Sequence, residues 1–362
     1  MKSIIYSLLL AISFNFVGAQ VIYEPFNSDK LGESRELKIQ LPRGYSEDTD
    51  KTYPLFIVFD GDYMFEAVAG NVEKRLDDCM YSGQNSLPIE TGANFFEFIG
   101  SELLPYIQNK YRVGNFKVAV GHGDTANFIN YFLLKDKPLF QGYIVVSPEL
   151  APKMSTYITN RLAKIESKTC YYLATSTNDV PSINKDSEEL NKSLSSIENE
   201  QLHYNFDSFV GPSHYSVPAH AIPKALEDIF LIFQPISKEE YHEKILKIET
   251  SPVVYLEEKY QTIDDIFGIK KQILINDFKA IEAAIEKKEE FQYYEDLGKL
   301  ARKEYPKTLL GNYYLARFYE ETGEPKKAMK TYQSAFILDE IGGITKDIVI
   351  EKADAIKKDF GY

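Results

Sequence analysis

Residues 118–128 hold the pattern that points most directly to chemistry. They read VAVGHGDTANF, an apolar run, a tight glycine-containing turn and then a helix-like stretch. This is the setting of a nucleophile elbow, in which a Ser occupies a strained strand-to-helix turn between small residues and attacks a carbonyl carbon. The central position is here Gly123. The sequence therefore predicts the backbone of an elbow without its nucleophile.

The neighbouring residues fix that alignment. Gly121 keeps the small residue two positions before the centre, but Thr125 puts a β-branched side chain where a Gly normally relieves crowding. A turn centred on Asp124 instead would place the large ring of His122 where a small residue is required. We therefore take Gly123 as the nucleophile position.

The elements that must position this turn alternate between strands and helices. Residues 53–59 (YPLFIVF) form a continuous apolar run, typical of a strand buried on both faces, whereas residues 35–41 alternate in polarity. Further strands are expected at residues 116–120, 143–146, 170–174 and 202–210, and helices at residues 95–109, 126–135, 154–166, 187–199 and 222–233. The alternation predicts an α/β fold, with a mostly parallel sheet covered by helices on both faces.

The composition changes to charged helical sequence after residue 235, so we expect a domain boundary between residues 235 and 250. The predicted domains are residues 20–235 and an all-helical domain of residues 236–362. Within the latter, residues 309–342 match the tetratricopeptide pattern at Leu315, Ala316, Tyr319, Ala328, Tyr332 and Ala335. Residues 294–305 look like the second helix of a degenerate preceding repeat. Two roles stay open for this tail: a buttress for the main domain, or a surface for a protein partner.

The first 19 residues have the pattern of a secretory signal peptide. They carry one Lys, an apolar stretch from Ile4 to about Val17, and the small-residue cleavage site Val17-Gly18-Ala19. A membrane anchor is the alternative, but the apolar stretch is short and no later run approaches the ~18 apolar residues that a span needs. We expect a mature chain beginning at Gln20, without a membrane span, in the periplasm or outside the cell.

Charge and cysteine content exclude several classes of function. The chain has 41 Lys and Arg against 54 Asp and Glu, a net charge of −13 without a basic stripe, which disfavours nucleic acid and anionic membranes as partners. The two cysteines, Cys79 and Cys170, are expected to be unpaired thiols, although an oxidising compartment would allow them to pair. Neither they nor the scattered histidines have zinc-ligand spacing, and Asp77-Asp78 is typical of solvated surface. No metal or other cofactor is expected.

Several motifs in order give the chain a family resemblance from about residue 33 to 234. They are Leu41-Pro42-Arg43-Gly44-Tyr45, Tyr53-Pro54 leading into Phe59-Asp60-Gly61-Asp62, Glu102-Leu103-Leu104-Pro105, Gly121-His122, Ser147-Pro148 and Ser213-His214-Tyr215-Ser216-Val217-Pro218. With these motifs the chain resembles the esterase branch of the α/β-hydrolases, the group that includes esterase D and the enterobactin-type siderophore esterases. The resemblance implies an α/β-hydrolase fold, and some relatives carry a repeat-bearing helical tail.

The resemblance also implies roles for individual residues. In that family a Ser attacks an ester, a His takes the Ser proton and an acid orients the His. His214 matches the general base, and Asp179 is the candidate acid, although an Asp before Val180-Pro181 is also ordinary turn chemistry. His122 stands where the family has the His of its Gly-His-Ser elbow. The oxyanion hole would use a backbone N–H of Gly61 or Asp62 and that of Asp124.

The departures from the family pattern predict a protein that binds rather than cleaves. A carboxylate at Asp124 would oppose the developing oxyanion, while an Asp in the first helical turn favours the helix dipole. Gly123 adopts strained turn conformations freely, so both residues suggest relaxation after catalysis was lost, and a Ser at 123 would restore little activity. The alternative is an active ester hydrolase that uses Asp124 or a water activated by His214. A small ester-like or sugar-like ligand fits either function.

The segment between Val72 and Phe95 departs from the family as well. The family has an apolar strand there, whereas this chain is polar and rich in turn residues. The sheet is therefore expected to be one strand short.

Overall fold

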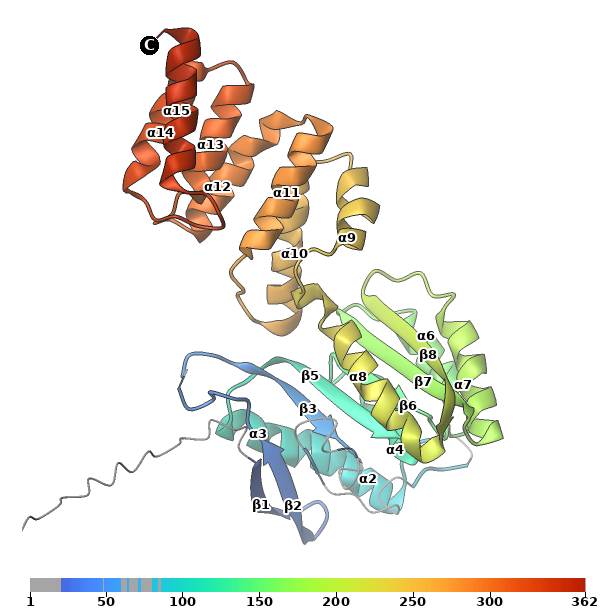
Figure 1. The fold of residues 1–362 in the computed structure, drawn as a ribbon. Coiled ribbons are helices and arrows are strands. Elements are labelled where there is room, and N and C mark those ends of the chain that lie inside the picture. The colour runs from blue at the N-terminus through green and yellow to red at the C-terminus, as the bar shows by residue number, and fades with distance from the viewer. Residues whose placement is uncertain are drawn as a thin grey trace, which may run out of the picture. The chain divides into compact units, whose positions relative to one another are not determined.

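The computed structural model describes residues 21–47, 49–59, 64, 71–72, 80–83 and 86–361, and every structural statement below concerns these residues. They form two compact units, of which the second begins at Glu227 (Figure 1). The predicted signal peptide at residues 1–19 lies outside the described residues.

The first unit is built on a sheet whose eight described strands run in the order β1-β2-β4-β3-β5-β6-β7-β8. The strand β2 is antiparallel to both of its neighbours, and all pairs from β4 to β8 are parallel. The bounds are β1 (Val21–Ser28), β2 (Glu33–Gln40), β3 (Tyr53–Val58), β4 (Asn71–Val72), β5 (Val113–His122), β6 (Gly142–Val146), β7 (Thr169–Asn178) and β8 (Leu202–Ser213).

Helices flank this sheet on both faces, as the sequence predicts. Successive strand residues point to opposite faces, and Ala119 shares a core cluster with residues of α2 to α7, while Val118 and Val120 are equally buried on the other face. Across that other face lies α8 (Figure 1). The bounds are α2 (Glu90–Glu97), the π-helix η3 (Phe98–Leu103), α3 (Leu104–Lys110), α4 (Asp124–Phe128), α5 (Asn130–Leu133), α6 (Met154–Leu162), α7 (Pro181–Leu194) and α8 (Val217–Ile229).

The sheet differs from the sequence prediction at its antiparallel end. The prediction that one strand is missing is wrong, because β4 pairs with β2 through Leu37 and Val72 and with β3 through Val58 and Asn71. With two residues, β4 is too short to give a periodic signal. The sequence does not predict the strand β1 either, although its alternate residues are exposed and it pairs with β2 along its whole length.

The second unit is helical. The 3-10 helices aside, its elements are α9 (Lys238–Glu243), α10 (Pro252–Phe267), α11 (Ile275–Lys288), α12 (Tyr294–Glu304), α13 (Leu310–Glu321), α14 (Pro325–Ser334) and α15 (Lys346–Phe360). Two glycines let α12 and α13 approach closely, since a Cβ at Gly298 would lie 2.6 Å from Leu315 Cγ and one at Gly311 would lie 2.4 Å from Arg302 Cγ. The tetratricopeptide assignment of residues 309–342, and a protein partner for it, stay predictions.

None of the helices in the described part of the chain combines the length and the apolar character needed to cross a bilayer.

Candidate functional site

The turn between β5 and α4 has a backbone that only glycine adopts readily. β5 ends at His122, α4 begins at Asp124, and Gly123 between them has φ 59° and ψ −122°. The turn is held on both sides, because the N–H of Gly123 donates to the carbonyl of Val146 and its carbonyl accepts from the N–H of Glu149. The strand-turn-helix geometry predicted around Gly123 is therefore present.

Crowding at this turn falls on Gly121 and not on Thr125. Thr125 is buried, and its Oγ1 accepts from the N–H of His122 (2.9 Å) and donates to the carbonyl of the same residue (2.8 Å). A Cβ at Gly121, by contrast, would lie 2.6 Å from both the carbonyl carbon and the carbonyl oxygen of Thr125. The β-branched side chain thus stabilises the turn, which corrects the sequence expectation that it would crowd it.

Replacing Gly121 with Ala should destabilise the first unit by about 3 kcal/mol, because the added methyl meets backbone atoms that cannot move aside cheaply. Chemical denaturation measures the loss. Gly83→Ala is the matched control, since no atom lies within 4 Å of a Cβ there and its φ is not positive. Equal stability of the two variants would show that the turn relaxes freely.

His214 and Asp179 form a hydrogen-bonded pair next to this turn. Asp179 follows β7, and His214 begins the 3-10 turn η4 (His214–Ser216) directly after β8. The N–H at His214 Nδ1 donates to Asp179 Oδ1 over 2.7 Å, with the carboxylate side chain fully buried and the imidazole 17% exposed. A Cβ at position 123 would lie 3.7 Å from His214 Nε2. The structure therefore brings together Gly123, His214 and Asp179, which the sequence places after three different strands.

Four donors surround the Asp179 carboxylate. Oδ1 also accepts from the N–H of Val180 (2.8 Å), while Oδ2 accepts from Ser147 Oγ (2.5 Å) and Thr175 Oγ1 (3.1 Å). Burial favours the neutral acid, but the hydrogen bonds from His214 and Ser147 outweigh it and lower the pKa of Asp179 to about 2. The carboxylate is ionised at neutral pH, so the proton on His214 Nδ1 lies in the bond to Asp179, and Nε2 is the ring nitrogen left toward position 123.

The other predicted site residues lie at varying distances from this pair. His122 packs on His214, with ring centroids 4.3 Å apart, and its Nε2 donates to the His214 carbonyl over 3.0 Å. Asp124 is the half-buried first residue of α4. Gly61 and Asp62, the candidates for the oxyanion hole, lie outside the described residues.

No metal site accompanies the pair in the part of the chain that the structure describes, where no group of three or more His, Cys, Asp or Glu residues could hold an ion. Cys170 is buried in β7. Cys79 and Asp77-Asp78 lie outside the described residues, so the state of the thiols stays a prediction.

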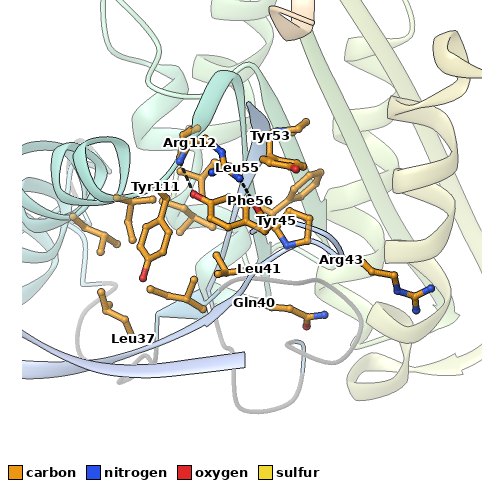
Figure 2. Close-up of a pocket in the computed structure, with 17 residues that line it drawn as sticks. Leu37, Gln40, Leu41, Arg43, Tyr45, Tyr53, Leu55, Phe56, Tyr111 and Arg112 are labelled. Atoms are coloured by element: carbon orange, nitrogen blue, oxygen red, sulfur yellow. Dashed lines mark hydrogen bonds between the residues drawn. The ribbon is translucent and has the colours of Figure 1, made fainter. Parts of the chain in front are cut away.

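An apolar cavity of about 320 Å³ lies at the other end of the sheet (Figure 2). Its lining includes Tyr53 and Val113, the first residues of β3 and β5, whereas the His214–Asp179 pair lies where the parallel strands end. Arg112 and Tyr45 also line the cavity. The guanidinium carbon of Arg112 lies 3.8 Å from the centroid of the Tyr45 ring, and the same group donates to the Tyr45 carbonyl. Ligands of open α/β sheets bind outside the carboxyl ends of the strands, so the pair, and not this cavity, is the candidate site.

Comparison with known proteins supports the fold. No protein-family model matches the sequence, and no curated protein matches it either. The crystal structure of an uncharacterised protein from Capnocytophaga ochracea is similar over 94% of this chain and 100% of that chain, with 29% identity and a TM-score of 0.84. An IroE-like serine hydrolase from Shewanella oneidensis is similar over 78% of this chain and 99% of its own, with 18% identity and a TM-score of 0.57. The BES protein from Bacillus cereus matches over 63% and 99%, with 18% identity and a TM-score of 0.50.

These similarities and the strand order agree with the expectation from the sequence. The chain has an α/β-hydrolase fold followed by a C-terminal helical region.

Proposed function

We propose that this chain is an exported esterase-like protein that has lost its nucleophile and binds a small ester-like or sugar-like molecule beside Gly123. The observation that carries the proposal is the intact His214–Asp179 pair next to a position without a side chain. A buried carboxylate is costly to desolvate. A site with no remaining use would not need such a pair aimed at the turn.

The hydrogen bonding of the pair defines the chemistry of the ligand. With Nδ1 bonded to Asp179, the Nε2 of a neutral His214 accepts a hydrogen bond, so the proposed ligand presents a donor there, and a hydroxyl group can take the place that a Ser hydroxyl has in active enzymes. The nearby carboxylate of Asp124 disfavours an anionic group at the same point. A neutral hydroxy ester or a sugar hydroxyl meets both conditions.

Assays on purified residues 20–362 test this function. We expect no hydrolysis of short-chain p-nitrophenyl esters above the rate of His214→Ala, because no side chain at 123 can attack. We expect ethyl lactate, which carries a hydroxyl, to shift the NMR signals of the His214 imidazole, and its O-methyl ether to leave them unchanged. Ester turnover that disappears in His214→Ala would contradict the binding role, as would equal shifts with both compounds.

A second function, hydrolysis by activated water, is favoured by the distance from position 123 to His214 Nε2. A water molecule there would give its proton to Nε2 while its oxygen adds to the ester carbonyl. The tetrahedral intermediate would then break its C–O bond and release the alcohol, which takes the proton back from His214. Asp124 is less suited to attack, because it is a helical residue and the strained turn position belongs to Gly123. Turnover that depends on His214 in the assay above would support this function.

A further inference from the structure

We infer that Ser147 is a positioning residue, which holds the Asp179 carboxylate in the orientation that the His214 pair requires. Ser147 follows β6, and its hydroxyl donates to Asp179 Oδ2 over 2.5 Å, leaving Oδ1 to His214 and to the N–H of Val180. Both side chains of this contact are buried. The inference rests on the proposed role of the His214–Asp179 pair as the ligand contact.

The backbone at Ser147 gives the first reason. Its φ is +46°, a left-handed conformation that glycine adopts freely and other residues rarely adopt. The following residue is Pro148, and a residue before proline is normally extended with negative φ. A glycine would suit this backbone better than a Ser. Backbone strain of this kind persists where the side chain makes an interaction that the protein needs. At this position that interaction is the hydrogen bond from the Ser147 hydroxyl to Asp179.

The surroundings of Ser147 give the second reason. Its own N–H donates to the carbonyl of Ala174 within β7. The residue before it, Val146, accepts from the N–H of Gly123, and Glu149 donates to the Gly123 carbonyl. The segment 146–149 therefore hydrogen-bonds to both the N–H and the carbonyl of Gly123, and through the Ser147 hydroxyl it also bonds to Asp179. Ser147 thus couples the position of Gly123 to that of Asp179.

Thr175 provides an internal comparison. Its Oγ1 donates to the same oxygen, Asp179 Oδ2, but over 3.1 Å and from within β7, without a positive φ. The shorter bond to the ionised carboxylate is the stronger one. Removing the Ser147 hydroxyl should therefore disturb the pair more than removing that of Thr175.

Proton NMR of purified residues 20–362 tests the inference without a ligand. A proton held between His214 Nδ1 and a buried carboxylate should give a downfield signal that exchanges slowly with water, assigned by its loss in His214→Ala. We expect this proton to exchange at least about tenfold faster in Ser147→Ala and Ser147→Gly, the change that corresponds to one lost hydrogen bond to a charged group. Thr175→Val should keep the signal.

The two Ser147 variants separate positioning from stability. Ser147→Gly relieves the backbone strain and Ser147→Ala keeps it, so the first should unfold at the higher denaturant concentration, although the proton exchanges faster in both. An unchanged signal in both folded variants would overturn the role of Ser147 and leave the proposed function standing. Absence of the signal in the unmodified protein would overturn the pair itself, and the proposed function with it.

Discussion

Gly123→Ser is expected to create ester hydrolysis that depends on His214. A Cβ at this position lies 3.7 Å from His214 Nε2 and meets no other described atom within 4 Å except Cε1 of the same ring. Because the Oγ of a Ser extends beyond its Cβ, one rotamer brings it within hydrogen-bond reach of Nε2. His214 is already oriented by Asp179. Nucleophile, base and acid would then stand in the order that acyl transfer requires.

The expected gain is at least about 100-fold over Gly123→Ala in the hydrolysis of p-nitrophenyl acetate, the scale of a positioned general base. Gly123→Ala is the matched control, since it imposes the same positive φ on a non-glycine residue without adding a hydroxyl. Both variants should lose about 1–3 kcal/mol of stability through that strain. The double variant Gly123→Ser with His214→Ala should return to the rate of the control.

This expectation reverses what the sequence alone suggests. The sequence predicts little restored activity, since Asp124 and Thr125 both depart from the elbow pattern. In the structure Thr125 fits the turn and hydrogen-bonds to the His122 backbone, so of these two departures the charge of Asp124 is the one that still opposes an oxyanion. If Gly123→Ser folds but matches Gly123→Ala in rate, then Asp124 or a lost oxyanion hole is the remaining obstacle, and Asp124→Asn in the same background identifies which.

The central strands and the turn at Gly123 could be predicted because their signals are local. Strands such as β3 and β6 are short apolar runs, buried on both faces along all of β6 and at the end of β3, and Gly123 stands in a motif of five residues. At the antiparallel end the signal fails: β1 carries Pro25 and is half exposed, and β4 has two residues. Those strands exist because β2 and β3 offer them backbone partners, which no local pattern records.

The role of Asp179 and of the side chains that bond to it could not be predicted from the sequence, for a different reason. Asp179 reads equally well as a turn residue, and only the fold places its carboxylate 2.7 Å from a His 35 positions later. Ser147 could be noted as part of Ser147-Pro148, but its positive φ and its contact with Asp179 arise from where β6 and β7 end. Such contacts depend on the register of parallel strands, and side-chain types alone do not reveal that register.

Asp179→Asn should be as destabilising as Gly121→Ala, although it adds no atom that clashes. The charge that receives the donors of His214, Ser147, Thr175 and Val180 is replaced by an amide, whose nitrogen would face donors wherever it points. We expect a loss of about 3 kcal/mol at pH 7 in urea denaturation, the scale of a broken buried pair. Asp186→Asn, at an exposed position on α7, should change stability by less than about 0.5 kcal/mol.

The difference between the unmodified protein and Asp179→Asn should also depend on pH. The pKa of Asp179 is about 2 in the folded chain, against an ordinary value of 3.8 for an Asp that has no such partners, so the folded state favours the ionised form. The stability that ionisation contributes is therefore complete above about pH 5 and is lost as the pH falls through 4 toward 2. Urea denaturation of both proteins between pH 2 and 7 should show their stabilities converging toward the acid end. A constant difference over that range would mean that the carboxylate stabilises the fold by its shape and packing and not by its charge.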